Sequence, residues 1–245
     1  MQRLTRYFLV PQQCYRFITD WSPWLTGAFL LTLGYGLIAG LCFAPADYQQ
    51  GDGFRIIYVH VPSALLAMGI YTIMTTTALI SLVFRIKLAT LVMQISAPIG
   101  ASFTFLALIT GSLWGKPMWG TWWIWDARLT SVLILFFLYL AFIAVRAAIS
   151  DPWARDRIAA WMAIIGFINI PIIHYSVLWW NTLHQGATLT VFNPSIAPSM
   201  LYPLLSMIIA FALFYLILLC QRLCADILYQ ERKAAWVQEI LHELT

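Results

Sequence analysis

The chain has 245 residues, of which 62% are hydrophobic and only 10% are charged, and its formal net charge is +4. A water-soluble domain has about 25% charged residues, and a soluble fold of this length could not keep so much apolar surface away from water. The composition therefore excludes an ordinary soluble protein and predicts an all-α integral membrane protein.

Long stretches without a charged residue mark the predicted membrane spans. They lie between Asp20 and Asp47, Arg55 and Arg85, Lys87 and Lys116, Arg128 and Arg146, and Arg157 and Arg222. A spanning helix needs roughly 17–25 apolar residues, so each of the first four stretches can hold one helix. The last stretch is long enough for two helices, and a break between them is marked by the turn-forming residues Asn181, Gln185, Gly186, Asn193 and Pro194. We therefore predict six transmembrane helices in a single domain, residues 1–245.

The distribution of basic residues predicts the orientation of these helices. The segments on one side of the membrane carry Arg3, Arg6, Arg16, Arg85, Lys87, Arg146, Arg155, Arg157, Arg222, Arg232 and Lys233. The opposite segments carry only Arg55, Lys116 and Arg128. Because short cytoplasmic loops are enriched in Lys and Arg, we expect both termini in the cytoplasm, with tails at about 1–20 and 224–245. The outer loops are then expected at about 44–58, 114–128 and 179–201.

Motifs for several common functions are absent from the sequence. No basic patch is interleaved with aromatic residues on the cytoplasmic side. We therefore expect the protein to contact membrane lipid but not to bind nucleic acid. No Gly-rich phosphate-binding loop is present, so any ATP hydrolysis would belong to another subunit. The four cysteines, Cys14, Cys42, Cys220 and Cys224, form no C-x-x-C-H motif for covalent haem attachment.

The C-terminal tail contains an amphipathic pattern. Val237, Ile240, Leu241 and Leu244 fall on one face of a predicted helix. Such a helix could lie on the membrane surface or dock onto a partner protein, and the pattern does not distinguish the two.

Two histidines are predicted to reach the outer face of the membrane from different parts of the chain. His60 lies in the segment IIYVHVPSALL, where Pro62 suits the first turn of a helix, and this places His60 at the outer mouth of the second span. His184, in the segment LWWNTLHQGATL, lies just past the fifth span and again on the outer side. A single interfacial histidine is most simply a hydrogen-bonded structural residue, but two at the same depth favour a metal or cofactor site.

A further histidine, His174, follows Pro171 by three residues. It is predicted inside the fifth span, where the proline should kink the helix and leave backbone carbonyls without their usual partners. A structural role, as a hydrogen-bond partner of these carbonyls, is the simplest interpretation.

The stretch WGTWWIWDARLT, residues 119–130, is rich in tryptophan. With Trp114 just upstream, it places Trp119, Trp122, Trp123 and Trp125 in the second outer loop. The aromatic belt at membrane interfaces explains scattered tryptophans at both faces. Such a density in one outer loop instead favours a platform for a flat, partly apolar ligand.

The same stretch contains one acid and one base, Asp126 and Arg128. Residues two apart do not face each other on a helix, so each charge would need its own partner there, whereas in an extended segment the two could pair. An arginine at the membrane rim is well shaped to hold a carboxylate in a bidentate contact. We count Asp126, Arg128 and the other outer arginine, Arg55, with the five tryptophans as candidate cofactor-binding residues.

Haem fits these features together. His60 and His184 would supply two neutral imidazoles for the iron, the tryptophans would form walls for the macrocycle, and an arginine would bind the propionates. We therefore expect haem b, bound non-covalently and transiently at the outer face, with His60 and His184 as the metal ligands.

The sequence also resembles a known family at these residues. WGTWWIWDARLT is similar to the WWD signature of the haem-handling proteins of cytochrome c maturation, and YVHVPSA and LWWNTLHQG resemble the contexts of their two histidines. Over essentially the whole chain, with six spans and no large outer domain, the sequence resembles the CcmC (haem exporter protein C) family rather than the larger haem lyases. The resemblance implies that His60 and His184 are axial ligands. It also implies that the segment from Trp114 to Arg128 contacts the haem edge and the receiving protein.

The resemblance further implies a place in a larger system. Haem would be delivered to the periplasmic haem chaperone CcmE for c-type cytochrome biogenesis. CcmD, CcmB and CcmA would be partners in an ABC-type complex, with CcmA hydrolysing ATP. The protein would lie in the bacterial inner membrane with its haem site facing the periplasm, and it would catalyse no reaction of its own.

Two other functions are compatible with parts of the sequence. One is a b-type haem subunit that passes electrons to or from quinone, although such subunits usually bury their haem ligands within the spans. The other is a transporter with its own pore, although few polar residues lie at mid-membrane and no inverted repeat is evident.

Overall fold

A computed structural model of the chain describes residues 10–180, 182, 184 and 196–243. Every regular element in these residues is a helix, and six helical segments are long and apolar enough to cross a membrane. They are Pro11–Phe43, Asp52–Phe84, Lys87–Trp119, Ala127–Ala148, Pro152–Trp179 and Pro198–Gln230. The predicted all-α architecture with six spans is confirmed. The turn-forming residues expected between the last two spans, Asn181, Gln185, Gly186, Asn193 and Pro194, lie outside the described residues.

The first two spans each join two kinds of helix. In the first span, α2 (Pro11–Ile38) continues into a π-helical turn, η1 (Ala39–Phe43). The second span begins with a 3-10 turn, η2 (Asp52–Ile56), which leads directly into α3 (Ile57–Phe84). The loop between the two spans is therefore shorter than the expected 44–58.

The start of α3 lies upstream of Pro62, so the prediction that Pro62 sits in the first turn was wrong. Phe54 and Ile57 are buried in a core cluster, and their packing favours helix before the proline is reached. His60 lies in the opening turn of α3, eight residues after the second span begins at Asp52.

The third span, α4 (Lys87–Trp119), extends further than predicted. It ends at Gly120, whose φ of +75° is the left-handed conformation that commonly terminates helices. The next helix, α5 (Ala127–Ala148), begins directly after Asp126. The outer loop expected at 114–128 is therefore reduced to residues 120–126, and Trp114 and Trp119 lie on the last turns of α4.

The fifth span consists of two helices, α6 (Pro152–Gly166) and α7 (Asn169–Trp179). Pro171 falls in the first turn of α7, where its missing N–H costs little, so the break occurs before it rather than at it. The carbonyl of Phe167 at the break accepts a hydrogen bond from the N–H of Ile170 at 2.9 Å. His174 is exposed, and its ring packs edge-on against Tyr175 at 4.8 Å, so the predicted role at freed carbonyls was wrong.

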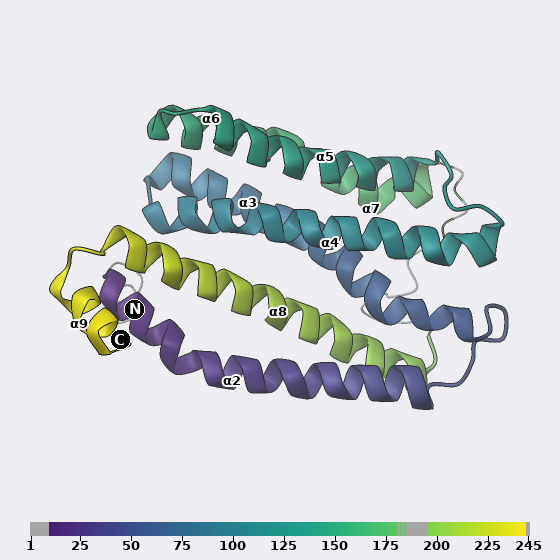
Figure 1. Cartoon of the computed structure of the whole chain (residues 1–245). Helices are drawn as coiled ribbons and strands as arrows, with labels where there is room; N and C mark the ends of the chain where they lie inside the picture. The colour runs from purple at the N-terminus through teal and green to yellow at the C-terminus, as the bar shows by residue number, and fades with distance from the viewer. Residues whose placement is uncertain (1–9, 181, 183, 185–195, 244–245) are drawn as a thin grey trace.

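The helices pack in layers (Figure 1). α2 packs against α8 (Pro198–Gln230), α3 and α4 lie centrally, and α5, α6 and α7 cover the other side. Close approach occurs where a glycine faces a buried tyrosine ring, as for Gly100 and Tyr139 or Gly166 and Tyr71. Lipid is as apolar as the protein core, so this close van der Waals packing is what holds spanning helices together.

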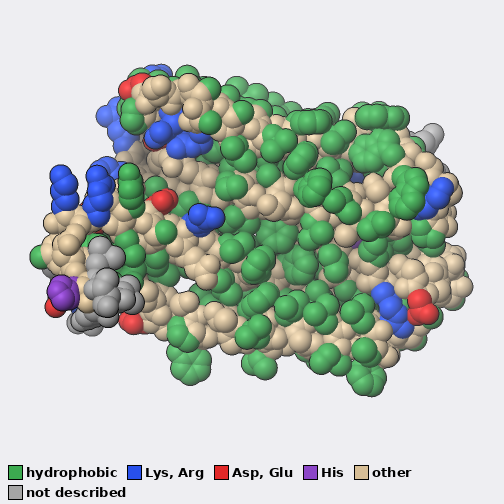
Figure 2. Space-filling view, in the orientation of Figure 1, with side chains coloured by type: hydrophobic (Ala, Val, Ile, Leu, Met, Phe, Trp, Pro, Cys, Tyr) green, Lys and Arg blue, Asp and Glu red, His purple; other side chains and the backbone are tan. Residues whose placement is uncertain are grey.

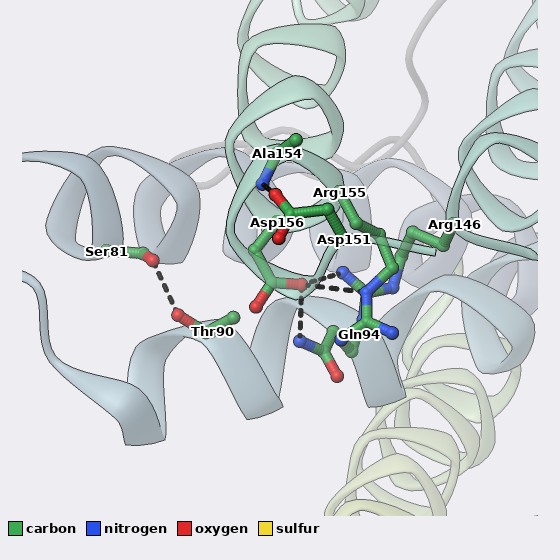
Figure 3. Close-up of polar contacts among 8 residues, drawn as sticks. All are labelled: Ser81, Thr90, Gln94, Arg146, Asp151, Ala154, Arg155 and Asp156. Carbon is green, nitrogen blue, oxygen red and sulfur yellow. Dashed lines mark hydrogen bonds and ion pairs between the residues drawn. The ribbon is translucent and has the colours of Figure 1, made fainter. Parts of the chain in front are cut away.

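The two ends of the bundle differ in charge. Both termini lie at the same end, as an even number of spans requires (Figure 1), and Lys and Arg side chains gather mainly there (Figure 2). At this end Asp156 accepts hydrogen bonds from Arg146 at 2.7 Å, from Arg155 at 3.3 Å and from Gln94 at 3.3 Å (Figure 3). This charge pattern is typical of a cytoplasmic end, and the orientation stays a prediction.

The C-terminal helix α9 (Ala235–Glu243) packs against the chain itself. Val237 is fully buried, and the ring of Trp236 lies 5.8 Å from that of Tyr15 at the start of α2. The sequence predicted either a membrane-surface helix or a partner-docking helix. In the structure, Val237 of the predicted apolar face packs against the rest of the chain. The side chain of Leu241 and all of Leu244 lie outside the described residues.

Candidate functional site

Most of the predicted site residues line one cavity, at the end of the bundle opposite the termini. The cavity has a volume of about 550 Å³ and lies between α3, α4, α5 and α7. It is lined by six of the ten residues predicted from the sequence, namely His60, Trp114, Trp119, Trp123, Arg128 and His184. Its other walls are largely small or apolar and include Ala64, Met68, Ala107, Val132, Leu135 and Ile173. A pocket of this size, apolar with a few polar groups, is typical of a small-molecule site.

The imidazole of His60 is held by residues of α4. Its Nδ1 lies 3.1 Å from the hydroxyl oxygen of Thr110. Its ring packs edge-on against that of Trp114, with the ring centres 5.6 Å apart. The glycine at position 111 leaves room for the ring, because a Cβ there would lie 3.1 Å from Cε1 of His60. The neighbouring helix therefore determines the direction in which His60 faces.

Two tryptophans on the last turns of α4 form part of the cavity wall. The indole N–H of Trp114 donates to the side-chain oxygen of Gln50 at 2.8 Å, which fixes this ring against the loop after the first span. The ring of Trp119 folds back over Gly115, where a Cβ would lie 2.9 Å from it. Trp119 also faces His184, with the ring centres 6.3 Å apart. Trp119 thus lies next to one candidate ligand and Trp114 next to the other.

The tryptophans of the loop after α4 divide into two groups. Trp123 lines the cavity, and its indole N–H is a buried donor with no partner among the described residues. Trp125 packs edge-on against Trp123 but is 76% exposed. Trp122 is also exposed, and its ring lies beside the ammonium of Lys116. Trp122 and Trp125 therefore belong to the rim of the site, outside the residues that line the cavity.

Asp126 and Arg128 have separate positions, as expected for a helical start. Arg128 lies in the first turn of α5 and lines the cavity. Asp126 caps α5 by accepting the N–H of Leu129 at 2.7 Å, and its other carboxylate oxygen accepts the hydroxyl of Thr182. That same hydroxyl oxygen accepts the backbone N–H of His184 at 3.1 Å. Asp126 therefore connects α5 to the segment that carries His184 and does not itself line the cavity.

Arg55 lies away from the cavity and stabilises the backbone near it. Its guanidinium donates to the carbonyl of Gly40 at 2.6 Å and to that of Ala44 at 2.9 Å, and it pairs with Asp52 at 3.0 Å. Gly40 lies in the π turn at the end of the first span and Ala44 directly follows it, where a helix end leaves carbonyl oxygens without intrahelical donors. The guanidinium is occupied by these partners, so Arg55 is not among the residues that face a ligand in the cavity.

Several residues that shape the site were not predicted. Thr110 and Thr182 contact the two histidines, and Gly111 and Gly115 make room for aromatic rings. A threonine in an apolar helix normally bonds its own backbone, and glycine is common in membrane helices, so neither residue type stands out. The one usable signal was the spacing of two glycines four residues apart beside Trp114, which places them on one helix face.

The arrangement suits a flat ligand that carries both a metal and acidic groups. His60 and His184 bring two imidazoles to one cavity, and two indole rings stand beside them. The buried N–H of Trp123 and the guanidinium of Arg128 are hydrogen-bond donors at its wall. Such donors match carboxylate oxygens.

Comparison with known proteins gives the family. Residues 4–238 match the family described as CcmC, Heme exporter protein C. The Heme exporter protein C of Haemophilus influenzae is 49% identical over 235 residues, which cover 96% of each chain. That of Escherichia coli K12 is 48% identical over 241 residues, 98% of each chain. That of Bradyrhizobium diazoefficiens is 51% identical over 197 residues, 80% of this chain and 74% of that protein. The resemblance drawn from the sequence is confirmed, and the chain belongs to the CcmC family of haem exporter proteins.

Proposed function

We propose that this protein binds haem b at the periplasmic face of the bacterial inner membrane and delivers it to the haem chaperone CcmE for c-type cytochrome biogenesis. The observation that carries this proposal is the single cavity that brings together His60, His184 and Arg128 from three different segments. Family membership supports the same conclusion, because the similar proteins carry the name Heme exporter protein C.

His60 and His184 are the axial ligands in this proposal. Both line the cavity, and neutral imidazole is a common ligand of haem iron. Two imidazoles are too few to hold a bare metal ion, and the described residues contain no group of three or more His, Cys, Asp or Glu placed to do so. A macrocycle that supplies most of the metal ligands removes this difficulty.

The remaining cavity residues fit the rest of the haem molecule. Trp114 and Trp119 offer flat apolar walls beside the two histidines. Arg128 and the indole N–H of Trp123 would bind the propionates. The contact with Trp123 would give a hydrogen-bond acceptor to a buried donor that has no partner among the described residues. The apolar wall formed by residues such as Val132 and Leu135 would receive the vinyl edge.

The exposed rim and the partners complete the proposal. Trp122 and Trp125 lie at the rim, where a receiving protein can reach them, and we assign them to that contact. Binding is non-covalent and transient, as delivery requires. The chain carries out no reaction of its own, and it works with CcmD, CcmB and CcmA, of which CcmA would hydrolyse ATP.

A transfer assay tests the proposal. The purified protein, loaded with haem in lipid nanodiscs, is mixed with haem-free CcmE, and the haem on each protein is measured over time. His60→Ala and His184→Ala are expected to lower haem loading and transfer by about tenfold or more, because each removes an iron ligand. His174→Ala is the matched control, since His174 lies outside the cavity, and it should transfer normally.

Two outcomes would contradict the proposal. One is normal haem occupancy and delivery in the double variant His60→Ala, His184→Ala. The other is rapid reduction of the bound haem by quinol with no transfer to CcmE, which would instead support a b-type electron-transfer subunit.

A further inference from the structure

A threonine outside the predicted site contacts the imidazole of His60. Oγ1 of Thr110, a buried residue of α4, lies 3.1 Å from Nδ1 of His60. We propose that Thr110 is a positioning residue that holds His60 in the Nδ1-protonated tautomer, so that Nε2 presents its lone pair to the cavity. This inference rests on the proposed function, in which Nε2 of His60 binds the haem iron.

The direction of this hydrogen bond follows from the other contacts of Thr110. A hydroxyl has one proton to donate and two lone pairs with which to accept. Oγ1 of Thr110 lies 2.7 Å from the carbonyl oxygen of Leu106 and 3.3 Å from that of Ala107. Carbonyl oxygens only accept, and the contact with Leu106 is the shortest, so the hydroxyl proton is directed to the backbone. A lone pair is left for His60, and Nδ1 must supply the proton between them.

The orientation of the ring makes Nε2 the nitrogen that is available in the cavity. A Cβ built on Gly111 would lie 3.1 Å from Cε1 of His60 and 3.6 Å from Nδ1, so this edge of the ring faces α4. No other ring atom, Nε2 included, lies within 4 Å of that Cβ, and the lone-pair directions of Nδ1 and Nε2 diverge widely in an imidazole. His60 lines the cavity, and the edge-on ring of Trp114 restricts its rotation.

The tautomer matters because a neutral imidazole binds a metal only through the nitrogen that lacks a proton. A hydrogen-bond partner on the other nitrogen fixes that choice in advance, orients the ring and makes the ligand more basic. Loss of such a partner typically weakens metal binding by about 10- to 100-fold. We expect an effect of this size on haem affinity when the hydroxyl of Thr110 is removed.

Three variants separate the hydroxyl from the rest of the side chain. Thr110→Val replaces the hydroxyl by a methyl group of similar size, whereas Thr110→Ser keeps the hydroxyl. Thr104→Val is the matched control on the same helix, because Thr104 is fully buried and its hydroxyl bonds the carbonyl of Gly100 at 2.7 Å.

The first measurement is ¹⁵N NMR of histidine-labelled, haem-free protein at a pH where the imidazole is neutral, with His60 assigned from its loss in His60→Ala. We expect a protonated Nδ1 and an unprotonated Nε2 in the wild type, Thr110→Ser and Thr104→Val. In Thr110→Val a larger fraction of His60 should be protonated at Nε2 than in the wild type, even though the carbonyl of Ala107 also accepts a hydrogen bond from the ring. A wild-type His60 that is protonated at Nε2 overturns the proposal, whether or not Thr110→Val folds.

The second measurement is the equilibrium haem affinity in nanodiscs. Thr110→Val should bind haem about 10- to 100-fold more weakly, and Thr110→Ser and Thr104→Val should bind it as the wild type does. Unchanged affinity in a folded Thr110→Val protein would also overturn the proposal. If His60→Ala itself binds haem normally, the proposed function fails, whereas the tautomer observed by NMR would still stand.

Discussion

Glycine at two positions of α4 determines the space available to the aromatic rings of the cavity. A methyl group at Gly111 would lie 3.1 Å from His60, and one at Gly115 would lie 2.9 Å from the ring of Trp119. Both distances are shorter than the 3.5–4.0 Å or so at which carbon atoms pack well. Glycine lowers helix stability by about 1 kcal/mol relative to alanine, so α4 is less stable at these positions than it would be with alanine.

Gly111→Ala should therefore weaken haem binding without lowering stability. The new methyl group displaces the imidazole of His60, while the gain in helix propensity of up to about 1 kcal/mol offsets the crowding. The measurements are haem affinity and Tm in the same nanodisc preparation. Gly69→Ala is the control, since Gly69 lies inside α3 with nothing within 4 Å of a Cβ, and its haem affinity should stay at the wild-type level. Equal haem affinity for the two variants would show that Gly111 has no role in placing His60.

The start of α5 and the segment after α7 are connected through one carboxylate. Asp126 caps α5 with one oxygen and accepts the hydroxyl of Thr182 with the other. An acidic side chain at a helix N-terminus is also favoured by the helix dipole. Because the hydroxyl of Thr182 in turn accepts the backbone N–H of His184, the position of this proposed ligand depends on the start of a different helix.

Thr182→Val should weaken haem binding by about tenfold, because the variant removes the connection to Asp126 and keeps the size of the side chain. Thr182→Ser keeps the hydroxyl and should restore binding. Asp151→Ala provides a comparison, because Asp151 caps α6 through the N–H of Ala154 at 2.7 Å, far from the cavity. That variant should lose the roughly 1 kcal/mol of a helix cap with no change in haem affinity. Haem binding by Thr182→Val at the wild-type level would contradict this role.

The whole bundle separates a basic end, which carries both termini, from an end that carries the cavity (Figures 1 and 2). The cost of moving Lys and Arg across the membrane makes this asymmetry an orientation signal. Tyr48, in the loop before η2, is 90% exposed at the cavity end, and Trp153, at the start of α6, is 68% exposed at the other. These two positions report directly on which end faces the periplasm.

Cysteine labelling tests the orientation. In a background with Cys14, Cys42, Cys220 and Cys224 replaced by serine, Tyr48→Cys should react with a membrane-impermeant maleimide in intact spheroplasts. Trp153→Cys should react only after the membrane is permeabilised, because we expect the basic loop around it to lie in the cytoplasm. The reverse pattern would place the cavity on the cytoplasmic side and rule out direct delivery to a periplasmic chaperone.

The span number, the helical class and the convergence of His60 and His184 could be predicted because they follow from the cost of charge and polarity in lipid. Helix ends were less predictable. The helix that contains Pro62 begins several residues before it, and span five breaks before Pro171. Both features depend on packing and on local hydrogen bonds. The roles of Asp126 and Arg55 could not be predicted, because their partners are a threonine and backbone carbonyls distant in sequence.

The central claim is that His60 and His184 together bind the iron of one haem. The most direct measurement is the absorption and EPR spectrum of the purified, haem-loaded protein beside His60→Ala, His184→Ala and the double variant. The wild type should show a low-spin, bis-histidine haem, and each single variant should lose this signature because one axial ligand is missing. A bis-histidine spectrum that persists unchanged in the double variant would contradict the claim.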